Sequence, residues 1–382
     1  MNGRDGDGEA LVGGIRTVGI EEEFLLVDPK TGVPTPPGRN VAAAVTRRIE
    51  LSGSTSGEAE HELTREQLET ATAPCAKIAD LRAELGALRR AAARSANEAG
   101  LSLAATGTSP QPATPSLTPT VRYRTMRDEY GLLAREQLTC GCHVHVAVAS
   151  DDEAVGVLDR IRVRLGPLIA LTANSPFWQA QDTDYASYRT QVWNRWPSAG
   201  SVGLFGSIEG YRACVEGLLE TGAILDEGMA YFDARLSSRY PTVEVRVADV
   251  CLNADDAVLL AALARALVTT AAEEWANGEP VPRVRTESIR LAHWRAARSG
   301  LSGELVDLEA GKAMPARVVI ERLVEYLRPA LERSGDATEV GILLERLYER
   351  GTGAERQRAA FARRGRLSDV MDLLARETVP GG

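Results

Sequence analysis

Three short stretches of the sequence each place two polar side chains two residues apart between apolar neighbours. The pairs are Glu21 and Glu23, His143 and His145, and Glu244 and Arg246. Alternation with a period of two predicts β-strands that have one apolar and one polar face. If the three strands share one sheet, their polar faces converge on one concave surface. Three such pairs in one chain suggest the floor of an active site.

The stretch PTVEVRVAD shows the alternation most clearly. Its valines point one way, whereas Glu244 and Arg246 point the other way, toward water, and Asp249 follows at the strand end. Read alone, the stretch is equally consistent with a solvated sheet face that carries an ion pair. The two companion pairs favour the catalytic interpretation.

The stretch TVGIEEEFLLVD carries three consecutive carboxylates, Glu21 to Glu23. This arrangement costs free energy, because like charges repel and strands disfavour glutamate. A metal ion or a cationic ligand would relieve that cost, and a solvated surface strand is the alternative. Carboxylates from separate strands suit Mg²⁺, and Arg246 could stabilise a transferring phosphoryl group or an acyl phosphate.

The stretch LTCGCHVHVAVA contains half of the protein's four histidines. His143 and His145 share its polar face, whereas Cys140 and Cys142 point into the core as small apolar residues. A His-x-His strand is also compatible with a zinc site that a glutamate completes, as in a metal-dependent hydrolase. The spacing alone leaves both chemistries open.

Residues 174–206 are rich in Trp, Tyr, Arg and Ser and lack periodicity. The aromatic and basic residues include Trp178, Trp193, Trp196, Tyr185, Tyr188, Arg189 and Arg195. Such residues in a loop suggest contact with a ligand. A cap over the sheet, held by aromatic packing, is the competing interpretation.

Composition narrows the class of protein. The chain has 382 residues, 44% of them hydrophobic and 25% charged, as is usual for a globular protein. Its net charge of −9 speaks against nucleic acid or an anionic membrane as the main partner. Scattered cysteines, no signal peptide and no long apolar run predict a soluble cytoplasmic protein. No Walker A loop, dinucleotide-binding glycine motif or serine nucleophile elbow occurs, so the sheet would have to hold any nucleotide.

The remaining pattern predicts an α+β protein. We expect strands over residues 17–28, 101–106, 138–149, 230–236 and 242–247, and helices over 40–51, 76–99, 151–173 and 207–219. Residues 61–73 suit a strand or a helix, and from residue 253 the chain is expected to be almost entirely helical. Residues 1–14 are expected to form a flexible tail, and residues 15–382 a single domain.

The chain resembles the carboxylate–amine ligase family of the type 2 glutamate–cysteine ligase group. The resemblance rests on GIEEEF at 19–24, CGCHVHV at 140–146, NSPFW at 174–178, YASYR at 185–189, WNRWP at 193–197 and RYPTVEVRVAD at 239–249. It implies a glutamine-synthetase-like fold, in which a curved antiparallel sheet has helices packed on its outer face and the C-terminal third is helical.

The resemblance also implies ATP-dependent ligation, in which glutamate is activated as γ-glutamyl phosphate and joined to cysteine or another amine. It implies Mg²⁺ ligands at Glu21, Glu23, Glu69 and Glu244, a catalytic role for Arg246, and substrate or nucleotide contacts at His143, His145, Tyr185, Arg189, Arg195 and Arg239. The implied partners are small molecules, and a homodimer is expected. A zinc-dependent hydrolase and a non-catalytic amino-acid or nucleotide sensor stay open as alternatives.

Overall fold

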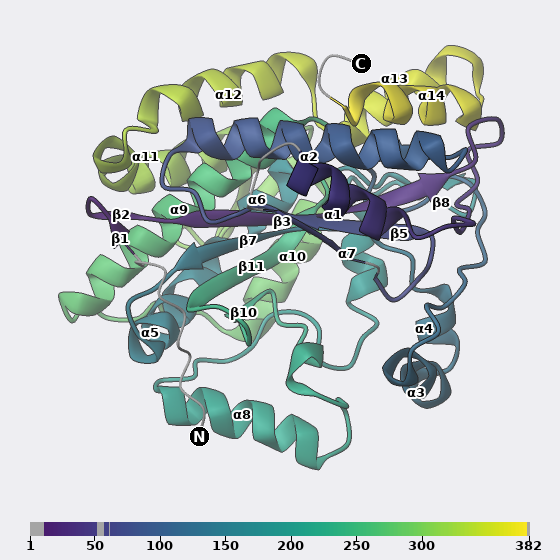
Figure 1. The fold of residues 1–382 in the computed structure, drawn as a ribbon. Helices are drawn as coiled ribbons and strands as arrows, with labels where there is room; N and C mark the ends of the chain where they lie inside the picture. The colour runs from purple at the N-terminus through teal and green to yellow at the C-terminus, as the bar shows by residue number, and fades with distance from the viewer. Residues whose placement is uncertain (1–10, 52–56, 61, 380–382) are drawn as a thin grey trace.

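The computed structural model describes residues 11–51, 57–60 and 62–379, and a seven-stranded antiparallel sheet lies at its centre (Figure 1). The strand order is β10-β11-β7-β3-β5-β4, and β6 also pairs with β3. The strands are β3 (Val18–Val27), β4 (Glu58–Glu60), β5 (Gln67–Ala71), β6 (Ser102–Ala104), β7 (Gly141–Ala147), β10 (Ala234–Leu236) and β11 (Thr242–Asp249). The three strands predicted to carry the polar pairs, β3, β7 and β11, are therefore neighbours in one sheet.

The apolar faces of these strands are buried beneath helices. The helices are α1 (Val41–Leu51), α2 (Ile78–Glu98), α3 (Val121–Tyr130), α4 (Leu132–Glu136), α5 (Asp151–Ile161), α6 (Gly166–Leu171), α7 (Tyr188–Trp193), α8 (Ile208–Glu220), α9 (Ala254–Ala276), α10 (Thr286–Ser299), α11 (Ala316–Ser334), α12 (Ala337–Arg350), α13 (Gly353–Arg364) and α14 (Leu367–Glu377). α9 packs against β3 and β7 and is apolar on nearly all sides. Of the helices described, none is long and apolar enough to cross a bilayer.

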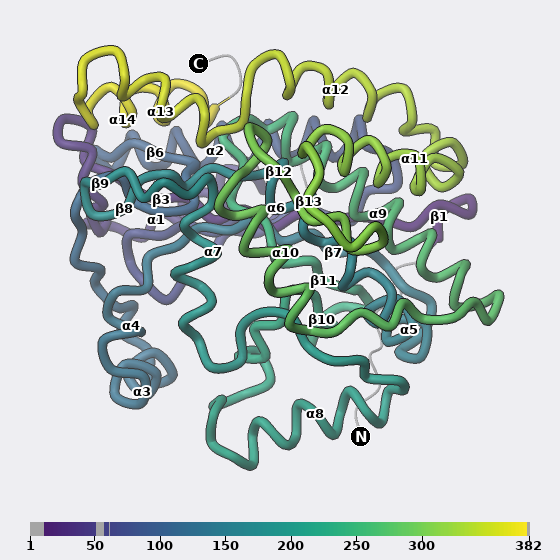
Figure 2. Tube along the Cα trace, turned by 180° about the vertical axis from the view of Figure 1, so that it is seen from behind, coloured from purple at the N-terminus to yellow at the C-terminus, as the bar shows by residue number. Residues whose placement is uncertain are grey.

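The sheet separates two groups of helices. α2 and α12 to α14 lie on one side, and α3, α4 and α8 lie on the other, in both Figure 1 and Figure 2. The second group belongs to the chain segments that cover the polar face of the sheet. The predicted fold, an antiparallel sheet of the glutamine-synthetase type with a helical C-terminal third, is confirmed.

Two predicted elements are wrong in detail. The long helix expected over 151–173 is broken into α5, a 3₁₀ helix (Arg162–Arg164) and α6. Pro167 lies in the first turn of α6. Proline has no backbone N–H to donate, and its ring would clash with the preceding turn of a continuous helix. The C-terminal third also contains a hairpin, β12 (Glu304–Asp307) with β13 (Lys312–Pro315), whose turn uses Gly311 at φ 64°.

Smaller strand pairs complete the fold. β8 (Phe177–Trp178) pairs with β9 (Gln181–Asp182), and β1 (Leu11–Val12) pairs with β2 (Ile15–Arg16) around two glycines with positive φ. Residues 1–10 of the expected tail lie outside the described residues, and residues 11–14 belong to the β1–β2 hairpin. The division into a tail and a single domain stays a prediction.

The middle carboxylate of β3 has its own buried partner. Glu22 points to the helix side of the sheet and is fully buried, together with Arg89 of α2. Nε of Arg89 donates to Glu22 at 2.9 Å, and the same guanidinium donates to the carbonyl oxygens of Cys251, Leu252 and Thr378. This ion pair removes one of the three adjacent charges of β3 from the site face. It also joins α2 and the end of α14 to the back of the sheet.

We predict that Arg89→Ala lowers the free energy of unfolding by about 3–5 kcal/mol, because it leaves Glu22 buried without its partner. Urea denaturation followed by circular dichroism measures this. The neighbouring exposed residue supplies the control, since Arg90→Ala should change stability by about 0.5 kcal/mol or less. Equal denaturation midpoints for the two variants would contradict the role given to the ion pair.

Candidate active site

The register of the sheet brings the predicted residues onto one face. Glu21 of β3 stands opposite His143 of β7, and His145 stands opposite Glu244 of β11. Paired residues of an antiparallel ladder point to the same side of a sheet. Glu23 in turn stands opposite Glu69 of β5, so the face extends over four strands.

A β-bulge shapes the centre of this face. Val245 pairs with Val144 and Ala248 with Cys142, so Arg246 and Val247 together stand opposite a single residue of β7. The extra residue re-aims the strand, and bulges often serve this purpose beside active sites. Because of it, the strictly alternating pattern expected to run through Val247 holds as far as Arg246, whose side chain shares the polar face with Glu244, and is interrupted at Val247.

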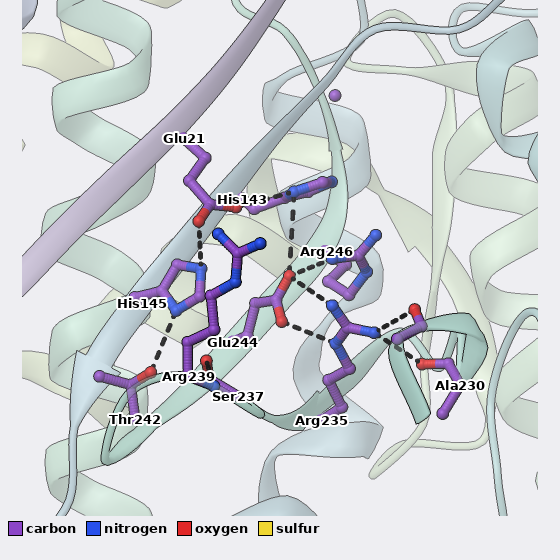
Figure 3. Close-up of polar contacts among 12 residues, drawn as sticks. Glu21, His143, His145, Ala230, Arg235, Ser237, Arg239, Thr242, Glu244 and Arg246 are labelled. Carbon is purple, nitrogen blue, oxygen red and sulfur yellow. Dashed lines mark hydrogen bonds and ion pairs between the residues drawn. The ribbon is translucent and has the colours of Figure 1, made fainter. Parts of the chain in front are cut away.

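The first of two clusters lies where β3, β7 and β11 meet (Figure 3). Nε2 of His145 lies 3.2 Å from one oxygen of Glu21, and Nδ1 of His143 lies 3.5 Å from the other. Glu244 pairs with Arg246 on its own strand and with Nε of Arg235 from β10, at 2.7 Å. Nδ1 of His143 also lies 3.9 Å from Glu244, so each carboxylate of this cluster has at least two cationic or hydrogen-bonding partners.

Charge explains the pKa values in this first cluster. Burial opposes ionisation of Glu21, but the charge of His145 and hydrogen bonds to both histidines hold its pKa well below the usual value. Burial likewise opposes ionisation of Glu244, but Arg246 and Arg235 outweigh it and lower its pKa. Both carboxylates are therefore ionised at neutral pH.

A second cluster contains Glu23, Glu69 and Glu62, whose carboxylate oxygens lie within 4.8 Å of one another. Burial, followed by the charge of Glu62, raises the pKa of Glu23 to about 7. Burial, followed by the charges of Glu62, Glu21 and Glu23, raises the pKa of Glu69 well above its usual value. One oxygen of Glu23 accepts a hydrogen bond from the backbone N–H of Gly141 at 2.6 Å. Since no arginine forms an ion pair with this cluster among the described residues, its like charges are not balanced as those of the first cluster are.

The polar face is covered, which corrects the expectation of strand faces open to water. Glu244 is 2% exposed, His143 3% and Arg246 7%. Trp196 and Tyr231 belong to a separate apolar cluster above the sheet, and Trp193 packs on Tyr231 with ring centroids 4.7 Å apart. Segment 174–206 thus fits both interpretations. Its Trp196 packs in the aromatic cap, and its Trp193 packs on Tyr231 and also faces the space over the sheet.

Two cavities of about 490 Å³ each flank Arg246. The carboxylate cavity is lined by both acidic clusters together with Arg122, Tyr123, Trp196, Asp226, Tyr231, Arg235, Arg239 and Tyr240. The tryptophan cavity is lined by Arg189, Trp193, Ser201, Phe232, Asp233, Arg290, Leu291, His293 and Trp294, among others. Arg246 and Trp193 line both cavities, and the guanidinium of Arg246 lies over the Trp193 ring at 5.7 Å.

Arg189 is the buried cation at the start of α7. It is 2% exposed, and its guanidinium lies over the Trp193 ring at 5.6 Å. Its Nε has no hydrogen-bond partner within residues 11–51, 57–60 and 62–379. A Cβ on Gly141 would lie 2.4 Å from this guanidinium, so any other residue at that position of β7 would displace Arg189. Glycine here lets the arginine pass close over the strand.

Asp249, at the end of β11, positions Arg189 through two serines. Its carboxylate accepts hydrogen bonds from the hydroxyls of Ser175 and Ser187, both at 2.7 Å. The Ser175 hydroxyl in turn accepts from the backbone N–H of Arg189 at 3.0 Å. Asp249 therefore acts on the site through the backbone of α7 and does not line either cavity.

The structure does not gather every residue that the resemblance singled out. Tyr185 contacts Tyr188 and accepts a hydrogen bond from Nε1 of Trp294, and it lines neither cavity. Arg195 pairs with Glu136 at 2.8 Å and also lies outside both cavities. Arg239 is largely exposed at the rim of the carboxylate cavity.

Two residues of the site were missed from the sequence. Glu62 lies in an irregular segment before β5, where no periodicity marks it. Arg235 lies on β10, a strand of only three residues that pairs with β11 opposite Glu244. Arg235 lies inside the strand expected over residues 230–236, next in sequence to the strand that carries Glu244, and this position was the available signal.

The zinc alternative needed both histidines and a glutamate at one point. Among the described residues, the groupings that could hold a metal ion include His145 but not His143. The geometry thus favours carboxylate-based ion binding over a His-x-His zinc site.

Comparison with known proteins identifies the family. The model of the glutamate–cysteine ligase family 2 matches residues 17–372. The chain belongs to this family. A protein of Frankia alni named "Putative glutamate–cysteine ligase 2-2" is 58% identical over 375 residues, covering 96% of this chain and 97% of its own length. A protein of Streptomyces coelicolor named "Putative glutamate–cysteine ligase 2" is 50% identical over 364 residues, covering 95% and 99%.

Solved structures show the same fold at low sequence identity. A glutamate–cysteine ligase of Francisella tularensis in complex with AMP aligns with a TM-score of 0.68 at 14% identity, over 95% of this chain and 88% of its own. A bifunctional glutathione synthetase of Pasteurella multocida aligns with a TM-score of 0.69 at 16% identity, over 95% and 52%. As a member of the glutamate–cysteine ligase family 2, the chain is an ATP-dependent carboxylate–amine ligase, which forms carbon–nitrogen bonds.

We predict that the two site histidines differ in charge in the metal-free protein. Burial and the charge of Arg246 lower the pKa of His143 to about 4, so it should be neutral from pH 5.5 to 8. Burial opposes protonation of His145, but Glu21 outweighs burial and raises its pKa, so it should be mostly protonated at pH 6. Long-range ¹H–¹⁵N NMR in EDTA measures both, with His143→Gln and His145→Gln for assignment. Two histidines that titrate together near pH 6.5 would contradict this electrostatic account.

Proposed function

We propose that this site joins glutamate to an amine by way of γ-glutamyl phosphate, using ATP and Mg²⁺. One observation carries the proposal: two carboxylate clusters and a buried arginine line one cavity on a single sheet face. Carboxylates suit the divalent cations that accompany ATP, and an arginine suits a phosphoryl group whose charge is spread over several oxygens.

The residues present fit Mg²⁺. Burial first, and then the charges of neighbouring carboxylates, raise the pKa values of Glu23 and Glu69, and a bound divalent cation would offset both causes. Glu62 completes that group with a third hard oxygen ligand. A second ion would be held by Glu21 and Glu244, with His145 beside them. Bound Mg²⁺ would neutralise phosphate charge and orient the phosphate oxygens.

The chain's own residues then account for the chemistry. A carboxylate oxygen of glutamate attacks the γ-phosphorus of ATP, the bond to ADP breaks, and Arg246 stabilises the charge on the transferring group. Glu244 and Trp193 hold the Arg246 guanidinium in place from two sides. An amine then attacks the acyl carbon, the carbon–nitrogen bond forms, and phosphate leaves with the oxygen that came from glutamate. The proton lost by the amine passes to solvent.

Unpartnered polar atoms support a ligand at this place. Nε of Arg246 and Nε2 of His143 are buried and have no hydrogen-bond partners in the part of the chain that the structure describes. Buried polar groups are nearly always paired, so unpaired ones at the meeting point of two cavities favour a ligand that satisfies them. His143, Arg189 and Arg239 are the candidates for substrate or phosphate contact. Tyr185 and Arg195 line neither cavity, so a ligand would contact them only if it extended beyond the two cavities.

We predict that Glu62→Gln weakens binding of Mn²⁺, used as a probe for Mg²⁺, by about tenfold or more, because it removes one charged ligand. Isothermal titration calorimetry without nucleotide measures the affinity. Glu60→Gln is the matched control, since Glu60 lines the same cavity but is outside the cluster. Equal affinities for the two variants would remove Glu62 from the site.

We predict that Arg246→Gln lowers kcat of glutamate- and amine-dependent ADP release by about 10²–10³-fold, through lost stabilisation of the transferring group. The assay couples ADP release to NADH oxidation and screens many amines. Arg212→Gln, an exposed change on α8, should leave kcat unchanged. ATP binding without turnover for every carboxylate and amine tested would contradict the proposal and favour the sensor.

A further inference from the structure

The tryptophan cavity lies on the far side of Arg246 from the metal-binding carboxylates and has a different chemistry. Its walls include Trp193, Phe232, Leu291 and Trp294, and neither of the two acidic clusters contributes to it. Leu291 is 64% exposed and Trp294 is 42% exposed, so α10 presents an apolar rim. Such a surface suits a ligand with an apolar or aromatic body.

One carboxylate stands at the inner end of this cavity. Asp233 precedes β10, and its carbonyl oxygen accepts from the backbone N–H of Arg246 at 2.9 Å. Its Oδ2 accepts from the Ser201 hydroxyl at 2.6 Å and lies 3.1 Å from Nδ1 of His293. Its Oδ1 has no hydrogen-bond partner among the residues that the structure describes. A fixed carboxylate with one open oxygen, next to the catalytic arginine, suits an ammonium group.

We propose that the tryptophan cavity binds the amine substrate, and that this substrate is a primary amine with a bulky apolar or aromatic body. The inference rests on the proposed ligase function and names the acceptor class for that site. The ammonium group binds Asp233 and loses a proton to solvent before its nitrogen attacks, and the apolar body lies between the indoles of Trp193 and Trp294. The attacking nitrogen is thereby placed on one side of Arg246, and the phosphates and the donor carboxylate on the other.

Size and charge distinguish this ligand from the donor. A cavity of about 490 Å³ is in the range that holds drug-sized ligands, so cysteine would leave most of it to water. The donor must bring its carboxylate to the phosphates in the carboxylate cavity. The tryptophan cavity is also lined by Arg189, Arg246 and Arg290, and within it the open oxygen of Asp233 offers an anionic contact for an ammonium group. The amine is therefore the substrate that fits here.

The test compares two amines that differ only by a phenyl ring, ethylamine and phenethylamine, with ATP, Mg²⁺ and glutamate. We expect KM for phenethylamine to be lower by about tenfold or more, because the ring is buried. Trp294→Ala should raise KM for phenethylamine about tenfold and that for ethylamine little. Trp275→Ala, which replaces a similarly exposed tryptophan outside both cavities, should change neither. Asp233→Asn should raise KM for both amines while leaving KM for glutamate unchanged.

Hydroxylamine separates this inference from the proposed function, because it is small and traps an acyl phosphate as a hydroxamate. Hydroxamate formation together with equal KM values for the two amines, or no effect of Trp294→Ala on their ratio, overturns the acceptor assignment alone. If no glutamyl hydroxamate forms, the proposed route through γ-glutamyl phosphate falls, and the acceptor assignment falls with it.

Discussion

Charge balance on a buried sheet face is the constraint on which the rest of this structure depends. Antiparallel register places carboxylates of β3, β5 and β11 on one surface, and that surface is covered rather than open to water. Buried charges are costly unless they are paired. Arg89 is the partner of Glu22 behind the sheet, and arginines and histidines are the partners of the first cluster. Among the described residues, no arginine or lysine forms an ion pair with the second cluster.

This division gives the two clusters different roles. Glu244 forms ion pairs with Arg235 and Arg246. It therefore orients Arg246, in addition to offering an oxygen to an ion. Glu23, Glu62 and Glu69 repel one another, so they gain most from a divalent cation. The cluster that is least stable by itself is thus the one best suited to bind Mg²⁺ tightly. The helices behind the sheet offset the repulsion within this cluster, because the apolar core and the buried Arg89 ion pair hold the strands in register.

Much of the fold and part of the site could be predicted from local pattern. Period-two alternation located β3, β7 and β11, and it assigned the side chains of Glu21, Glu23, His143 and His145 to the correct face. The pattern could not reveal the bulge at Arg246, because a bulge depends on pairing between two strands and not on one sequence. Nor could it reveal burial, since the cover over the sheet is built by segments distant in sequence.

Glu62 and Arg235 were missed for the same reason. Each lies in an irregular or very short element, and each becomes meaningful only through a partner on another strand. Tyr185 and Arg195 show the converse case. Their motifs are distinctive in sequence, yet in the structure they pack against α10 and α4 outside the two cavities.

The transfer of oxygen between the substrates tests the central claim most directly. If this face of the sheet passes the γ-phosphoryl group of ATP to a carboxylate, an oxygen of that carboxylate must leave with the phosphate. Glutamate labelled with ¹⁸O in its γ-carboxylate, turned over with ATP, Mg²⁺ and an amine, should yield inorganic phosphate that carries one ¹⁸O atom per molecule, read as a shifted ³¹P NMR signal. Unlabelled phosphate, formed with labelled glutamate and ordinary water, would show that water receives the phosphoryl group and would contradict the account.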